Sequence, residues 1–157
     1  MKSKFFIILL LLLSIPGCDF FTDPEDDSNS TEKIVMDNGI EHTLSVSKNV
    51  MSLRDTLTVT FSIKNNSTAP KTYNFANVQQ LGFNITDKSN RTVISYPMIV
   101  SPALSNFTVH PGETKRLTVR SLLKNSEGYF IPTGHYILKA YLLDRNSPQL
   151  TLRITVQ

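Results

Sequence analysis

A strict alternation of apolar and polar residues constrains this fold more than any other feature of the sequence. From Leu57 to Ile63 every second residue is apolar, and the residues between them are threonine or serine. Successive side chains of a β-strand point to opposite faces, so this period of two places one apolar row against a core. No segment has a helical stripe, and we expect an all-β chain. Further alternating runs contain Leu44, Leu81, Val93, Leu117, Leu138 and Leu152.

Turn-forming residues separate these runs. Asp87–Asn90 is a candidate hairpin turn, and Pro111-Gly112 fits the centre of a type II turn, because proline presets φ and glycine accepts a positive φ. Tyr136, two residues after Gly134, resembles the tyrosine of a sandwich corner, whose hydroxyl binds back to a loop. Seven or eight short strands spaced in this way indicate two packed antiparallel sheets.

Residues 1–17 are typical of a secretory signal peptide. Lys2 and Lys4 precede an unbroken apolar run, Phe5–Leu13, that is too short to cross a bilayer as a helix, which takes about 20 residues. The chain has a single cysteine, Cys18, shortly after this run. The segment Ile15–Cys18 resembles the lipobox of bacterial lipoproteins, which implies cleavage before Cys18 and lipidation of its sulfur.

We expect residues 18–40 to be the lipidated cysteine and an acidic, flexible tether. Between Asp19 and Lys33 there are six acidic residues and one lysine, and there is no apolar periodicity, a composition that disfavours folding. Two or three acyl chains hold a protein firmly at a membrane, so the predicted location is extracytoplasmic and membrane-anchored. We favour the outer membrane or the cell surface; the inner membrane is the alternative, because an aspartate follows Cys18.

Four segments carry a resemblance to a known family: Leu57–Ser67, Leu81–Asp87, His110–Glu113 and Pro132–Leu142. In their order and spacing the folded domain resembles the BsuPI family, named after an intracellular proteinase inhibitor of bacilli. The family fold is an immunoglobulin-like sandwich, and the resemblance implies a proteinase inhibitor. The chain has no tryptophan, whereas the family often has one around Ile94–Pro97. From the strand pattern and the family fold together, we predict that residues 41–157 form an immunoglobulin-like antiparallel β-sandwich of seven to eight strands.

No constellation for catalysis or metal binding is present in the sequence. The three histidines, His42, His110 and His135, are expected at strand starts or in a turn, as surface or turn residues without metal-ligand spacing. There is no Gly-x-Ser-x-Gly elbow and no glycine-rich phosphate loop. We predict no enzyme activity, no cofactor and no metal. Basic residues from Ile34 onward are dispersed, so nucleic acid is not an expected partner.

The segment from Tyr96 to Phe107 is the strongest candidate for partner binding, because it is apolar, contains two prolines and does not alternate. One interpretation is a rigid, exposed loop that a partner grips. The other, which we favour, is an edge strand and crossover whose Ile99, Leu104 and Phe107 fill the sandwich. A second candidate segment is Leu122–Thr133.

We therefore predict a lipid-anchored, extracytoplasmic module that binds another protein, a proteinase if it acts as BsuPI inhibitors do. The first alternative is a structural or assembly accessory lipoprotein of the cell envelope without inhibitory activity. The second is a carbohydrate-binding sandwich, which the absence of tryptophan disfavours. The candidate partner-binding residues are Tyr96, Pro97, Met98, Ile99, Pro102, Tyr129 and Phe130.

Overall fold

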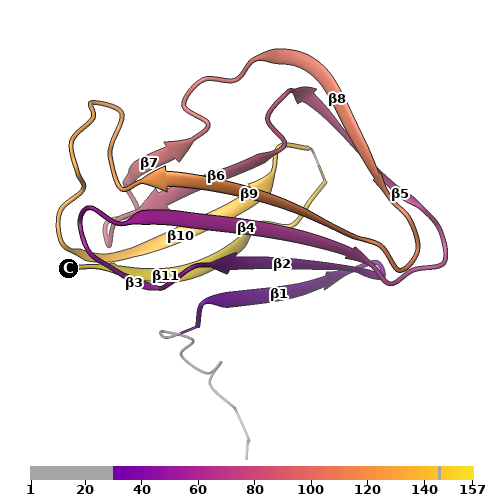
Figure 1. Cartoon of the computed structure of the whole chain (residues 1–157), viewed down its shortest axis with the longest axis horizontal. Coiled ribbons are helices and arrows are strands. Elements are labelled where there is room, and N and C mark those ends of the chain that lie inside the picture. The colour runs from indigo at the N-terminus through magenta and orange to yellow at the C-terminus, as the bar shows by residue number, and fades with distance from the viewer. Residues whose placement is uncertain (1–29, 145) are drawn as a thin grey trace, which may run out of the picture.

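The computed structural model describes residues 30–144 and 146–157, and all the regular secondary structure in this part of the chain is β-strand (Figure 1). The predicted all-β sandwich is confirmed, with more strands than the seven or eight expected. The strands are β1 (Glu32–Asp37), β2 (Ile40–Val46), β3 (Val50–Met51), β4 (Thr56–Asn65), β5 (Lys71–Asn77), β6 (Leu81–Thr86), β7 (Thr92–Tyr96), β8 (Pro102–Val109), β9 (Thr114–Leu122), β10 (Gly134–Leu142) and β11 (Leu150–Val156).

Two main sheets enclose the core. One has the strand order β1-β2-β4-β9 and the other β3-β11-β10-β6-β7, and all pairings are antiparallel except that of β3 with β11. The predicted alternation holds in β4, where Leu57 to Ile63 bury every second side chain, and in β10, where Leu138 is fully buried. Burying one such side chain contributes about 1.5–3 kcal/mol, so these rows supply much of the stability.

A two-stranded ribbon, β5 with β8, is connected to β4 and β9 through two bends (Figure 1). Its inner face is aromatic: the Phe107 ring lies 5.1 Å from that of Tyr73 and 5.4 Å from that of Phe75, centroid to centroid. At the bend, the buried Asn65 donates hydrogen bonds to the carbonyls of Ala69 (2.8 Å) and Val109 (2.9 Å). One amide side chain therefore holds the β4–β5 connection against the end of β8.

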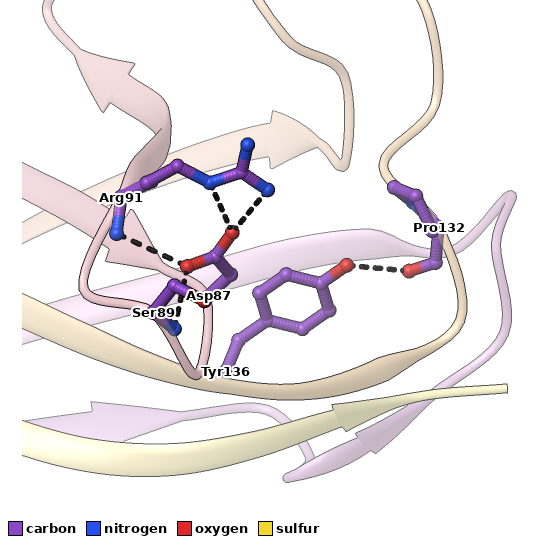
Figure 2. Close-up of polar contacts among 5 residues, drawn as sticks. All are labelled: Asp87, Ser89, Arg91, Pro132 and Tyr136. Atoms are coloured by element: carbon purple, nitrogen blue, oxygen red, sulfur yellow. Dashed lines mark hydrogen bonds and ion pairs between the residues drawn. The ribbon is translucent and has the colours of Figure 1, made fainter.

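The turns expected from the sequence are present, and two of them lie close together in Figure 2. The Tyr136 hydroxyl donates to the Pro132 carbonyl at 2.7 Å, which confirms the tyrosine corner. In the β6–β7 turn, the Asp87 carboxylate accepts from the backbone N–H groups of Arg91 and Ser89 and pairs with the Arg91 guanidinium at 2.8 Å. The hydrogen bond from the Arg91 amide is the main cause that lowers the pKa of Asp87.

The N-terminal boundary differs from the prediction. β1 pairs with β2 along its whole length, and the Val46 N–H donates to the Thr31 carbonyl at 2.9 Å. The expected tether is therefore wrong for residues 32–40, which belong to the sandwich. Asn38-Gly39, with φ of 48° and 79°, makes the tight turn between the two strands, a common hairpin signal that the sequence interpretation overlooked.

His42 is also placed differently, because β2 begins at Ile40 rather than at His42. In this register His42 shares the inward face with Ile40 and Leu44, and it is 2% exposed. The expectation of a surface histidine is wrong here. The predicted signal peptide, Cys18 and residues 19–29 of the predicted tether lie outside the described residues. Within the described part of the chain, there is no helix of the length and apolarity needed to span a membrane.

Candidate partner-binding surface

Residues 97–101 form a loop between β7 and β8 that is held at both ends. At its start, the Tyr96 ring stacks on Phe83 with centroids 5.4 Å apart and planes 13° from parallel. At its end, the Ser101 N–H donates to the Gln79 side chain at 3.1 Å, and the Ser101 carbonyl accepts from the Val78 N–H at 3.2 Å. These contacts fix where the loop leaves and rejoins the sandwich.

The apolar side chains of this loop and of Leu104, at the start of β8, face solvent. Ile99 is 83% exposed and Leu104, on β8, is 92% exposed. The favoured interpretation, in which both fill the sandwich, is therefore wrong, although Phe107 does fill it. The inner face of the ribbon is already occupied by Phe107 and its aromatic neighbours. We call the exposed set the apolar tip: Val78, Met98, Ile99, Val100 and Leu104.

The other predicted residues of this segment have different surroundings. Tyr96 is partly buried by its stacking on Phe83, and Pro97 is partly buried beside it, so both support the loop. Pro102 is exposed where β8 begins. Both prolines fix φ and so restrict the backbone at the two ends of the loop.

The second candidate segment lies between β9 and β10. Tyr129 is 69% exposed, and the Phe130 ring lies 4.7 Å from the Lys124 ammonium. The Asn125 side-chain oxygen accepts the Tyr129 N–H at 2.9 Å, which holds the loop in shape. This loop lies beside the start of β7, with which it lines a hollow, whereas residues 97–101 follow the end of β7 (Figure 1). The two candidate segments therefore do not form one continuous surface.

No site for a metal is apparent in the described residues, where no three His, Cys, Asp or Glu side chains come together. His42 Nε2 and the Tyr73 hydroxyl lie 3.4 Å apart, and both residues line a small cleft. Burial lowers the pKa of His42, although Asp37 and Asp144 act against it, and burial raises the pKa of Tyr73 to about 12. Burial therefore favours the neutral form of both side chains.

A family model described as intracellular proteinase inhibitor, BsuPI, matches residues 44–147. The chain belongs to the BsuPI family. The match runs from β2 to beyond β10 and covers both candidate loops of the BsuPI domain. The family is one of proteinase inhibitors. No curated protein matches the chain.

Solved structures resemble the BsuPI domain only distantly. They include an alkylpurine DNA glycosylase, AlkC, of Pseudomonas fluorescens bound to DNA (11% identity, TM-score 0.48, 82% of this chain and 31% of that one). A β-glucosidase of Erythrobacter marinus has 14% identity and a TM-score of 0.47, over 82% of this chain and 16% of that one. The sporulation control protein Spo0M of Bacillus subtilis has 11% identity and a TM-score of 0.46, over 82% of this chain and 50% of that one. Because this chain spans at most half of these proteins, their activities are not carried over.

Proposed function

We propose that this protein is a lipid-anchored, extracytoplasmic, non-enzymatic module that binds a proteinase and inhibits it by presenting residues 97–101. Membership of the BsuPI family supports the inhibitor assignment. The observation that carries the choice of surface is the loop itself, which is anchored at both ends while Met98 and Ile99 are more than two thirds exposed.

The geometry of the loop suits a proteinase cleft. Proteinase clefts have specificity pockets that receive substrate side chains, and Met98 or Ile99 offers an apolar side chain to such a pocket. Burying it would contribute about 1.5–3 kcal/mol. A loop already held by the Tyr96 ring and by Ser101 loses less conformational freedom on binding, which improves affinity further.

Inhibition assays test this proposal. The full-length protein, purified in detergent, is assayed against a panel of extracytoplasmic and cytoplasmic proteinases. We expect inhibition at micromolar concentration that is lost when Met98 and Ile99 are both changed to serine. Tyr129→Ser, on the other loop, is the matched control and should still inhibit. Inhibition of none of the proteinases would remove the inhibitor assignment and favour the envelope accessory role.

The location needs a separate test, because the family is named intracellular whereas residues 1–18 are typical of an exported lipoprotein. Mass spectrometry of the mature N-terminus, combined with protease treatment of intact cells, reports lipidation and topology together. We expect the chain to begin at an acylated Cys18 and to fractionate with membranes, and Cys18→Ser to abolish both. An unprocessed N-terminus in a cytoplasmic fraction would overturn this part of the proposal.

A further inference from the structure

β9 is a long free edge of the first sheet. It pairs only with β4, in an unbroken register from Thr114 to Leu122. The Asn65 N–H donates to the Glu113 carbonyl at 3.0 Å, which sets the alternation of the antiparallel ladder. The odd-numbered residues of β9 therefore bond to β4. Arg116, Thr118 and Arg120 direct their backbone N–H and C=O groups to the side where no described strand pairs.

The other strand edges of the described residues are shorter than β9 or interrupted. β1, the opposite edge of the same sheet, pairs with β2 without a register shift but has six residues against the nine of β9. β3 has two residues, β7 has five and a register shift against β6, and the β5–β8 ribbon has a register shift between Phe75 and Asn77. Such features prevent unwanted pairing of edges. β9 has nine residues without proline or register shift, so only its charges discourage pairing.

A groove runs beside this edge. The inward side chains Leu117 and Val119 pack on the core but stay half-buried, and with Val78 and Tyr96 they line a hollow of about 160 Å³. An added strand would place every second side chain over this groove, because strand side chains alternate between faces. The apolar row next to the edge would then be covered.

The charged side chains of β9 indicate which kind of strand could pair with its free edge. Arg116 and Arg120 are exposed and make no ion pair within the described residues. If a second copy added its own β9 antiparallel about Thr118, each Arg116 would lie opposite an Arg120, and like charges placed opposite one another are destabilising. In this register carboxylates opposite the two arginines would be favourable, so the charges of the edge favour an acidic strand over a second β9.

We propose that β9 binds an extended acidic segment of a partner protein by β-strand addition. Backbone hydrogen bonds form with Arg116, Thr118 and Arg120, carboxylates lie opposite the two arginines, and apolar side chains of the segment cover Leu117 and Val119. This proposal does not rest on inhibition through residues 97–101, since the edge takes its strand whether or not that loop binds a proteinase.

The test uses the full-length protein in detergent and a labelled, capped peptide of about seven residues in which glutamate alternates with valine. Fluorescence anisotropy measures affinity, and amide hydrogen exchange locates the contact. We expect saturable binding that weakens as salt rises, with slower exchange at the amides of Arg116, Thr118 and Arg120.

Matched variants separate strand addition from simple charge attraction. Thr118→Pro removes an outward N–H that the sheet does not use, and we expect it to weaken binding about tenfold or more. Ile34→Pro is the matched change on the opposite edge, in β1, and should leave affinity unchanged. Arg116→Glu combined with Arg120→Glu should transfer binding to the peptide with lysine in place of glutamate, which keeps the test valid if a proline variant fails to fold.

Two results would overturn the proposal. In the first, the acidic peptide binds but exchange at the three edge amides does not change, which shows that charge alone attracts it. In the second, these amides are already protected in the free protein, which shows that the edge is occupied by the chain's own acidic segment 19–27 or by a second copy.

Discussion

The β5–β8 ribbon and the loop that precedes β8 carry two apolar surfaces with opposite surroundings. On the inner face, Tyr73, Phe75 and Phe107 pack ring against ring and are buried. At the apolar tip, Ile99 and Leu104 are almost fully exposed. Burial makes the first set a source of folding stability, whereas the second contributes almost nothing to the fold. An apolar surface that the fold does not use is the part available to a partner.

Truncating an aromatic side chain on the inner face of the ribbon should give the largest loss of stability. Phe107→Ala removes the ring shared by Tyr73 and Phe75 and leaves a cavity, so we expect the free energy of unfolding to fall by about 3–5 kcal/mol. Leu104→Ala, three positions away on the same strand, should change it by no more than about 0.5 kcal/mol. Denaturant unfolding of both variants measures the contrast, and similar losses in the two would break the comparison.

The second largest loss of stability should come from removing the Asn65 side chain, which holds the ribbon at its bend. Asn65→Ala leaves the buried Val109 carbonyl without its side-chain donor and frees the Ser67 N–H, and we expect a loss of about 2 kcal/mol. Asn66→Ala, on the exposed neighbour, is the control and should stay within about 0.5 kcal/mol of the wild type. Thermal or denaturant unfolding measures both, and a neutral Asn65→Ala would show that water replaces the amide.

His42 should give the domain a mild acid sensitivity. Its pKa in the folded state lies below its ordinary 6.5, so the unfolded chain takes up a proton first as pH falls. The stability that neutral His42 contributes is fully present above pH 6.5. It is lost below this pH, at no more than about 1.4 kcal/mol per pH unit. Unfolding free energies measured from pH 7 to 5 should show this slope, which His42→Gln should flatten and His135→Gln, on an exposed strand position, should not.

The strands of the sandwich could be predicted from the sequence because their signal is local. Leu57–Ile63 alternates cleanly, and Pro111-Gly112 and Asp87–Asn90 are short-range turn signals. β1 was missed because its acidic flanks resemble a tether, although Asn38-Gly39 is a hairpin signal in its own right. The inward position of His42 follows from that turn, since the turn sets where β2 begins.

The surface was harder to predict because exposure depends on what else fills the core. Ile99, Leu104 and Phe107 are all apolar and close in sequence, and only the packing of Phe107 against Tyr73 and Phe75 shows that the inner face is already occupied. The free edge of β9 could not be found either, because strand order depends on pairings between residues far apart in sequence. Long-range geometry of this kind has no local signature.

The smallest effect on stability should come from the apolar tip. We expect Ile99→Ser to leave the free energy of unfolding within about 0.5 kcal/mol of the wild type, because the Ile99 side chain is 83% exposed and folding removes little of it from water. Denaturant unfolding measures this, with Ile94→Ser, buried on the neighbouring β7, as the contrast that should lose several-fold more. A loss above about 1 kcal/mol from Ile99→Ser would mean that the tip packs onto the domain in solution. The tip would then belong with the inner face of the ribbon, and its apolar character would be explained by folding alone.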